Sequence, residues 1–198
     1  MTDIILIIAA YLIGSFPSSL IIGKVFYQTD IREHGSGNLG ATNAHRVLGA
    51  KGGLAVFFLD IFKGFAAMWL AQAFGQGIHP IIIAIFAIIG HIYPVFANFR
   101  GGKAVATTGG IIIFLAPWHS LGLIILFIIT LAIWKMVSLS STILALAVIA
   151  MVWLTPGFDR VEAIFLTLFA CLVILKHTSN YKRILNGTEN KFAFKKKI

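Results

Sequence analysis

The stretch Ile78-His-Pro-Ile-Ile-Ile-Ala-Ile-Phe-Ala-Ile-Ile-Gly-His-Ile-Tyr-Pro-Val-Phe96 contains no Asp, Glu, Lys or Arg. A helix of about 20 residues crosses the hydrocarbon core of a bilayer, which is roughly 30 Å thick, because each residue adds about 1.5 Å. The runs Ile4–Ile22 and Leu54–Phe74 have a similar length and are mostly apolar. These three runs predict membrane-spanning helices.

The composition of the whole chain agrees with a membrane environment. Hydrophobic residues make up 59% of the 198 residues and charged residues 12%, whereas soluble domains have about 45–50% and about 25%. A water-soluble chain of this length cannot bury so much apolar surface. The composition therefore excludes a soluble enzyme and predicts an all-α, polytopic integral membrane protein, which we expect to form a single domain over residues 1–198.

Four shorter apolar runs leave the number of spans between five and seven: Val105–Ala116, Leu121–Trp134, Leu139–Leu154 and Val161–Leu175. If the first two formed one helix, it would be about 45 Å long, which exceeds the thickness of the core. Pro117 would also lie at its centre, where proline breaks or kinks a helix. A hairpin that turns near Ala116-Pro117-Trp118-His119 fits better.

The charges favour seven spans. The formal net charge is +9, and a seven-span arrangement places 14 of the 16 basic residues on one side: Lys24, Arg32, Arg46, Lys51, Arg100, Lys103, Lys135, Lys176, Lys182, Arg183, Lys191, Lys195, Lys196 and Lys197. Merging the fourth and fifth spans would divide this set. Because basic loops stay on the inner side, we expect the amino terminus outside and the carboxyl terminus in the cytoplasm, where Lys195–Lys197 would contact anionic lipid. Basic residues scattered between apolar runs do not indicate a nucleic-acid partner.

The first polar segment, Gly35–Asn43, contains the Gly-x-Gly-x-x-Gly pattern of dinucleotide sites but lacks the strand, turn and helix that such a site requires. A better interpretation is a loop whose amides surround an oxyanion. The side chains of Ser36, Asn38, Thr42 and Asn43 would assist beside Gly37, and Arg46 would add a bidentate charge. A tight re-entrant turn, with glycines for packing, explains the same residues equally well.

The second polar segment, Phe99–Gly110, strengthens the anion hypothesis. Gly101 and Gly102 permit close approach of the backbone, Lys103 supplies a positive charge, and Thr107 lies where a membrane helix begins. Helix-start amides, a hydroxyl and a lysine are typical of phosphate sites. The alternative to a phosphate site is that Lys103 only follows the positive-inside rule and that the glycines only form a turn. Two such loops on one face favour a shared phosphate cavity.

Two further polar segments share the predicted cytoplasmic face, Lys135–Ser141 and Lys176–Arg183. His177 and Asn180 are three residues apart and would share one helix face. Asp60 and Lys63 have the same spacing inside the second span, where we expect a structural ion pair that faces the bundle. His91 is most simply a hydrogen-bonded interior histidine.

Four motifs in this chain resemble, in order, those of the bacterial acyl-phosphate-dependent glycerol-3-phosphate acyltransferases, the PlsY family. They are Gly-Ser-Gly-Asn-x-Gly-Ala-Thr-Asn (35–43) with Arg46, Phe-x-Gly-Gly-Lys-x-Val-Ala-Thr (99–107), Ser-Leu-x-Ser (138–141), and Lys-His-x-x-Asn-x-x-Arg (176–183) with Gly187 and Glu189. The likeness extends over nearly the whole chain. One departure is Ala104, where the family often has glycine.

The resemblance implies seven membrane helices with an active site that faces the cytoplasm. It also implies transfer of a fatty acyl group from acyl phosphate to the 1-hydroxyl of glycerol 3-phosphate, which gives lysophosphatidic acid and phosphate in the committed step of phospholipid synthesis. The expected partners are therefore these two substrates and membrane lipid, in the bacterial cell membrane.

This reaction suits the polar residues, since both substrates carry a phosphate. We expect direct attack by the glycerol hydroxyl, because the chain lacks a nucleophile motif such as Gly-x-Ser-x-Gly. The expected catalytic residues are Ser36, Arg46, Lys103 and His177, and the expected substrate-binding residues are Gly37, Asn38, Thr42, Asn43, Gly101, Gly102, Thr107, Ser138, Ser141, Asn180 and Arg183. The donor's own phosphate, as the resemblance implies, or else His177 would accept the proton. No cofactor or metal site is expected.

A transporter for phosphate or an organic phosphate is the alternative function. Alternating access requires a site near the middle of the membrane and usually paired repeats. The polar residues of this chain are instead predicted to gather at one face, which favours the enzyme.

Overall fold

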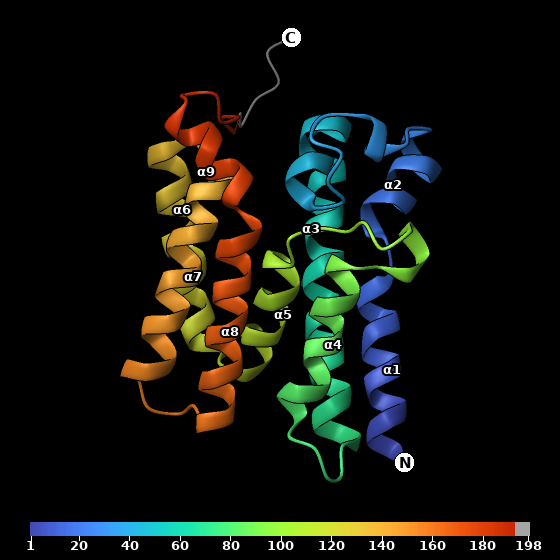
Figure 1. Cartoon of the computed structure of the whole chain (residues 1–198), viewed down its shortest axis with the longest axis vertical. Coiled ribbons are helices and arrows are strands. Elements are labelled where there is room, and N and C mark those ends of the chain that lie inside the picture. The colour runs from blue at the N-terminus through green and yellow to red at the C-terminus, as the bar shows by residue number, and fades with distance from the viewer. Residues whose placement is uncertain (193–198) are drawn as a thin grey trace. The chain divides into compact units, whose positions relative to one another are not determined.

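The computed structural model describes residues 1–192, so the predicted lipid contact of Lys195–Lys197 lies outside the described residues. These residues form only helices, which confirms the all-α prediction (Figure 1). The chain divides into two compact units, Met1–Leu115 and Ala116–Ile198, each described by itself. The prediction of a single domain stays a prediction.

The first unit contains five α-helices and two 3-10 turns: α1 (Thr2–Ser15), α2 (Ser18–Tyr27), η1 (Ile31–Glu33), α3 (Ala41–Phe74), α4 (Pro80–Ile92), η2 (Val95–Ala97) and α5 (Val105–Leu115). The expected first span, Ile4–Ile22, is broken, because α1 and α2 are bent by 41° at Phe16-Pro17. Proline disfavours the helical conformation of the preceding residue, and Phe16 accordingly has a ψ of 114°. The break therefore follows from Pro17.

Helix α3 begins at Ala41 rather than at Leu54, where the second apolar run starts. The polar residues Thr42, Asn43 and Arg46 thus lie in the first turns of a long helix and not in a loop. Gly49, with a φ of +80°, bends the helix between this polar portion and the apolar portion. Glycine adopts this left-handed conformation without the steric cost that other residues bear.

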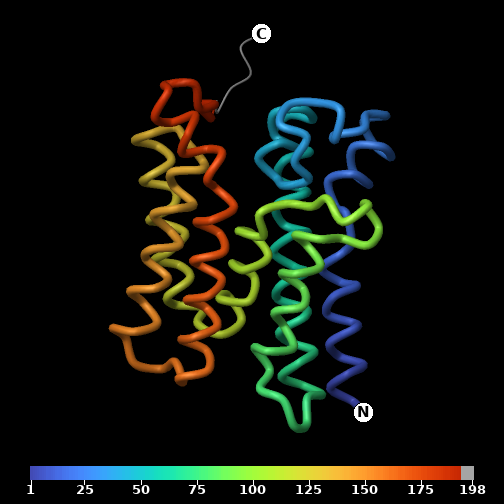
Figure 2. Tube along the Cα trace, viewed as in Figure 1, coloured from blue at the N-terminus to red at the C-terminus, as the bar shows by residue number. Residues whose placement is uncertain are grey.

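Glycine allows α3 and α5 to pack with their backbones in contact. A Cβ atom on Gly110 of α5 would lie 2.0 Å from the carbonyl oxygen of Ile61 in α3. Close backbone approach at small residues is a principal source of helix packing in membranes. The polar segments Gly35–Asn43 and Phe99–Gly110, called the first and second glycine-rich segments below, run into the starts of α3 and α5. The packing of α3 on α5 therefore connects the two segments (Figure 2).

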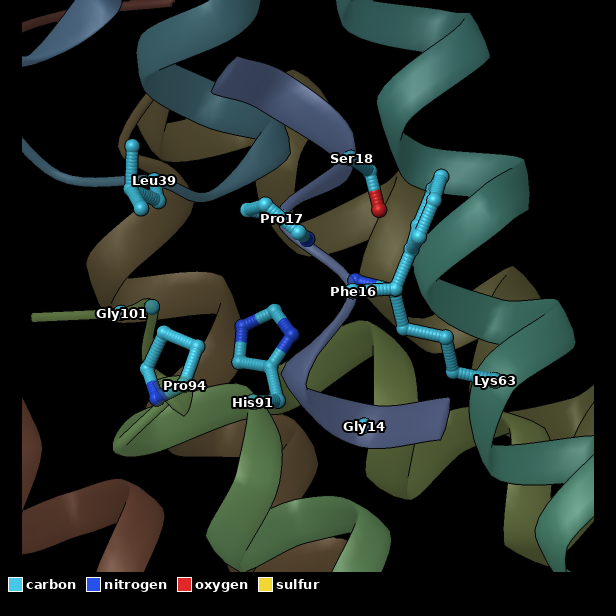
Figure 3. Close-up of a pocket in the computed structure, with 10 residues that line it drawn as sticks. Gly14, Phe16, Pro17, Ser18, Leu39, Lys63, His91, Pro94 and Gly101 are labelled. Atoms are coloured by element: carbon cyan, nitrogen blue, oxygen red, sulfur yellow. The ribbon is translucent and has the colours of Figure 1, made fainter. Parts of the chain in front are cut away.

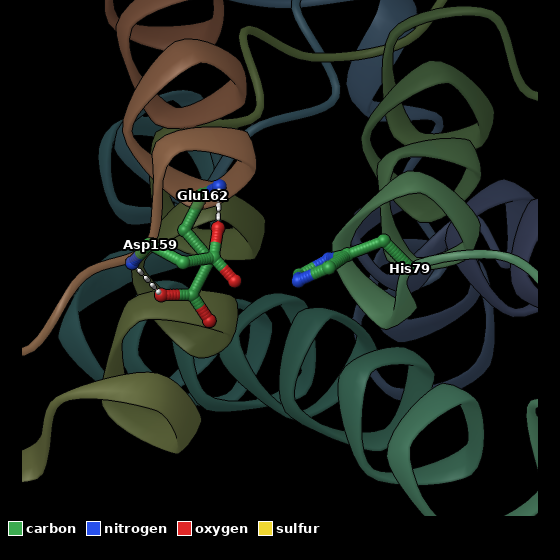
Figure 4. Close-up of side chains that lie close together, drawn as sticks. All are labelled: His79, Asp159 and Glu162. Carbon is green, nitrogen blue, oxygen red and sulfur yellow. Dashed lines mark hydrogen bonds between the residues drawn. The ribbon is translucent and has the colours of Figure 1, made fainter.

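The second unit contains four helices: α6 (Pro117–Trp134), α7 (Val137–Leu154), α8 (Arg160–Lys176) and α9 (Thr178–Leu185). Asp159 and Glu162 form a capping box that starts α8, with bonds of 2.8 Å and 3.2 Å between each carboxylate and the other residue's amide (Figure 4). Helices α8 and α9 are bent by 48° at His177. This bend directs the predicted substrate residues of α9 away from the axis of α8.

Helices α5 and α6 are separate, with only Ala116 between them. The single helix from Val105 to Trp134 is therefore excluded, as expected from Pro117. Proline occupies the first position of α6, where its missing N–H costs nothing.

The described residues provide four helices long and apolar enough to cross a membrane, or six if each bent pair counts as one span. The expected fourth span, Val105–Ala116, corresponds to α5, which has 11 residues and a length of roughly 16 Å, about half the thickness of the core. Seven spans and the sides of the two termini are therefore not confirmed and stay predictions. Many large apolar side chains, such as Phe58, Ile128 and Leu175, are exposed, as expected for surfaces in contact with lipid.

Adjacent glycines of α5 provide a test of this packing. We expect Gly110→Ala to lower the melting temperature of the detergent-solubilised protein by several degrees, because its methyl group would overlap the backbone of α3. The control is Gly109→Ala, whose Cβ atom would meet nothing within 4 Å and which should leave the melting temperature unchanged or raise it. Equal melting temperatures for the two variants would contradict the close α3–α5 contact.

Candidate functional site

The Asn43 side chain organises the first glycine-rich segment. Its Oδ1 atom accepts hydrogen bonds from the amide of Ser36 at 2.8 Å and from Nη1 of Arg46 at 3.3 Å. Its Nδ2 atom donates to the carbonyl oxygens of Ile31 at 3.3 Å and His34 at 3.1 Å. Asn43 is buried, whereas Ser36 and Arg46 are exposed. The segment therefore presents Ser36 and Arg46 at its surface and uses Asn43 for its own structure.

The two glycine-rich segments contact each other, as the sequence predicts. Asn38 donates a hydrogen bond from Nδ2 to the carbonyl oxygen of Gly101 at 3.3 Å, and its Oδ1 accepts the amide of Gly40 at 3.0 Å. Gly40 is the N-cap residue of α3, and Lys103 lies two residues before the start of α5. Amides at helix starts favour anions. Two anion-attracting helix starts are thus joined through one asparagine.

The backbone conformation of Ala104 explains why glycine is common at this position in the family that the sequence resembles. It is buried and has a φ of +59°, a left-handed conformation that costs residues other than glycine roughly 1–2 kcal/mol. The sharp change of direction at Ala104 separates Lys103 from α5.

A buried polar network lies behind these segments. The Oδ1 atom of Asp60 in α3 accepts hydrogen bonds from Lys63 at 2.7 Å and from Ser18 of α2 at 2.8 Å. His91 of α4 approaches the same oxygen to 3.8 Å and lies 3.1 Å from the hydroxyl of Thr107. The expected ion pair of Asp60 and Lys63 and the expected hydrogen-bonded His91 are both confirmed. The network also includes Thr107, which the sequence assigns to substrate.

A small pocket of about 200 Å³, open mouth included, lies between this network and the two glycine-rich segments. Leu39, Gly101 and Gly102 contribute from those segments, and Lys63 and His91 contribute from the network. Figure 3 shows the Lys63 side chain reaching from α3 toward the break between α1 and α2, with the His91 ring beside it. A buried cation, helix-start amides and glycine backbone can together receive an anionic or hydroxyl oxygen.

A second polar cluster occupies the second unit, around Glu189. Its Oε1 atom accepts hydrogen bonds from Ser138 of α7 at 2.7 Å and Asn180 of α9 at 2.6 Å, and its Oε2 atom accepts Nε of Arg183 at 2.7 Å. Burial alone raises the pKa of this carboxyl, but the bonds from Asn180, Ser138 and Arg183 outweigh it, so the pKa lies below its ordinary value. Three predicted substrate residues thus converge on one carboxylate.

His177 lies at the junction of α8 and α9 and is 3% exposed. Its Nδ1 atom donates a hydrogen bond to the carbonyl oxygen of Val173 at 2.7 Å. When the ring is neutral, its proton therefore lies on Nδ1 and its lone pair on Nε2. Ser141 is also buried, on α7 one turn after Ser138.

Glu189 was not predicted as a site residue, although it accompanies the fourth sequence motif. The contribution of Lys63 and His91 to a pocket was not predicted either. Glu189 had a usable signal, since it is one of few carboxylates in a basic polar segment. Nothing in the sequence around Lys63 and His91 indicates a pocket. A polar residue within an apolar run has the same sequence surroundings whether it lines a ligand pocket or only pairs with another buried residue. The assignments of the individual site residues to catalysis or binding stay predictions.

Comparison with known proteins was consistent with the resemblance. A family model described as glycerol-3-phosphate acyltransferase matches residues 4–187. A glycerol-3-phosphate acyltransferase of Geobacillus kaustophilus is 48% identical over 192 residues, which cover 96% of each chain. One of Streptococcus pneumoniae (strain Hungary19A-6) is 46% identical over 198 residues, covering 96% of this chain and 93% of the relative.

Two solved structures are also similar to this chain. A crystal structure of PlsY (YgiH), described as an integral membrane glycerol 3-phosphate acyltransferase in its glycerol 3-phosphate form, has a TM-score of 0.90 and 33% identity. A form of PlsY with lysophosphatidic acid has a TM-score of 0.87 and 32% identity. Each alignment covers 98% of this chain and 96% of the other.

The cluster around Glu189 predicts a pH-dependent contribution to stability. A carboxyl whose pKa is lowered by folding stabilises the folded state above its unfolded pKa of about 4.3, and this stabilisation is lost as the pH falls through the folded pKa. We therefore expect Glu189→Gln to lower the melting temperature at pH 7, and the difference from wild type to shrink below pH 4. Melting curves from pH 3 to pH 8 measure this difference, and a difference that grows at low pH would contradict the assignment.

Proposed function

Because the chain belongs to the glycerol-3-phosphate acyltransferase family, we propose that it transfers a fatty acyl group from acyl phosphate to the 1-hydroxyl of sn-glycerol 3-phosphate. The products are lysophosphatidic acid and phosphate, and the step commits carbon to phospholipid synthesis. Family membership supports an integral membrane acyltransferase that acts on glycerol 3-phosphate, and the PlsY structures hold glycerol 3-phosphate and lysophosphatidic acid. The use of acyl phosphate as the acyl donor is what our proposal adds to family membership.

The observation that carries the proposal is the joining of two glycine-rich segments at helix starts through Asn38 and Gly101. Each segment ends in a helix whose first amides attract anions. Each is accompanied by a cationic side chain, the exposed Arg46 or the half-buried Lys103. In our proposal these two residues and Ser36 bind phosphate. Asn43 and Asn38 act through the shape of the loop, because the structure uses their amides for internal hydrogen bonds.

We also propose a substrate-binding role for residues of the polar cluster around Glu189. We assign Arg183 and Asn180, both held by Glu189, to substrate binding together with Ser138 and Ser141. The Glu189 carboxylate fixes the direction of these donors and neutralises part of their charge. A site for a dianionic substrate needs such a framework, since flexible lysines and arginines alone hold a phosphate loosely.

The chemistry requires little covalent assistance from the protein. Acyl phosphate is a mixed anhydride with a good leaving group, so the glycerol hydroxyl attacks the acyl carbon directly while the bond to the phosphate oxygen breaks. Alignment of the two reactants contributes up to about 7–11 kcal/mol in well-oriented systems. In this proposal the proton of the hydroxyl passes to the donor phosphate, and His177 is the first protein group that we would assign to this role instead.

The proposed location is the bacterial cell membrane, with the site toward the cytoplasm, where glycerol 3-phosphate is soluble and the acyl chain remains in lipid. The reaction as proposed uses neither a cofactor nor a metal ion. We therefore assign no role to a divalent cation, and EDTA should leave turnover unchanged.

A comparison of donors tests the proposal. The purified, detergent-solubilised protein is given radiolabelled glycerol 3-phosphate with palmitoyl phosphate, palmitoyl-CoA or palmitoyl-acyl carrier protein, with and without EDTA. We expect labelled lysophosphatidic acid from palmitoyl phosphate alone, at the same rate with the chelator. Product from palmitoyl-CoA would contradict the donor, and absence of product from all three donors, with glycerol 3-phosphate flux in sealed vesicles, would favour a transporter.

A further inference from the structure

The turn that precedes Lys103 is held by backbone bonds on both sides. The amides of Gly101 and Gly102 donate to the carbonyl oxygens of Ile92 and His91, each at 3.1 Å. The carbonyl oxygen of Gly101 accepts Nδ2 of Asn38. The end of α4 and the first glycine-rich segment therefore fix the backbone immediately before the lysine.

The His91 ring lies directly beneath this turn. A Cβ atom on Gly102 would be 2.2 Å from Nε2 of His91, so glycine is required for the turn to rest on the ring. On its other side the ring places Nδ1 3.1 Å from the hydroxyl of Thr107, in the first turn of α5. His91 thus contacts residues on both sides of Lys103, one before it and one after it.

The orientation of the His91 ring is fixed by buried groups of three other helices. Its Nδ1 atom faces the Asp60 carboxylate at 3.8 Å, and Asp60 is itself held by Lys63 and Ser18. All of these side chains are at most 6% exposed. A fully packed polar network of this kind has few alternative arrangements, because each unsatisfied group would be costly.

We propose that His91 and Thr107 form a positioning pair that sets the place of Lys103 relative to the substrate phosphate. The proposal rests on the proposed function and assigns Thr107 to this pair rather than to direct contact with substrate. Loss of the Thr107 hydroxyl releases the α5 side of the turn, and Lys103 then meets the phosphate less often in the correct geometry. Asp60, Lys63 and Ser18 support the pair from behind.

Adjacent threonines of α5 allow a matched test. Thr107→Val keeps the shape of the side chain and removes the hydroxyl that contacts His91, whereas Thr107→Ser keeps that hydroxyl. The control is Thr108→Val, since the buried Thr108 hydroxyl has no hydrogen-bond partner among the described residues. Acyl transfer from palmitoyl phosphate is assayed in wild type and in these three variants. Lys103→Ala and the double variant Thr107→Val/Lys103→Ala are assayed in the same way. For each protein we measure KM and kcat for each substrate and the melting temperature.

We expect Thr107→Val to raise about tenfold the KM of whichever substrate Lys103→Ala affects, as the loss of one buried hydrogen bond implies. Thr107→Ser should restore wild-type KM, Thr108→Val should match wild type, and the double variant should be no worse than Lys103→Ala, because coupled residues are not additive.

Three results would overturn the positioning pair while leaving the function intact. They are an unchanged KM in Thr107→Val, a loss of turnover that only follows the loss of thermal stability, and a double variant whose defect is the product of the two single defects. A wild-type protein that makes no lysophosphatidic acid would instead overturn the proposed function, and this proposal with it.

Discussion

The first unit depends on the carboxylate of Asp60, which is buried among apolar helices and therefore must be neutralised. Lys63 supplies the opposite charge from the next turn of α3 at 2.7 Å, and Ser18 reaches the same oxygen from the start of α2. Removing one member of such a pair costs about 3–5 kcal/mol, because it leaves an unpaired charge in a medium of low dielectric constant. His91 lies 3.8 Å from the same carboxylate oxygen. Lys63, Ser18 and His91, which all neighbour this carboxylate, also line the pocket beside Gly101.

Much of the fold follows from the apolar runs, because a lipid-embedded backbone has to satisfy its hydrogen bonds within helices. The sequence correctly predicts an all-α chain and the separation of α5 from α6 at Pro117. It misses the break at Phe16-Pro17, because the run Ile4–Ile22 was assigned by its length and overall apolar character although Pro17 lies within it. It also misses the amino-terminal extension of α3 to Ala41. Hydropathy measures the affinity of a segment for lipid, and a polar helical extension has none.

The sequence predicts which residue types form the candidate site better than it predicts which of those residues contact one another. Two glycine-rich segments with a cation each are visible in the sequence, and the structure joins them through Asn38 and Gly101. The sequence does not show that the Asn43 amide is used inside its own loop, that Thr107 contacts His91, or that Glu189 gathers Ser138, Asn180 and Arg183. These contacts join residues of different elements, so spacing along a single helix or loop cannot predict them.

In the proposed function, the two joined glycine-rich segments bind phosphate for acyl transfer. Phosphate release from palmitoyl phosphate by the purified protein, with and without glycerol 3-phosphate, tests it most directly. We expect release that requires the acceptor in wild type and that is lost in both Arg46→Ala and Lys103→Ala. Release that is indifferent to glycerol 3-phosphate, or that survives in both variants, would contradict it.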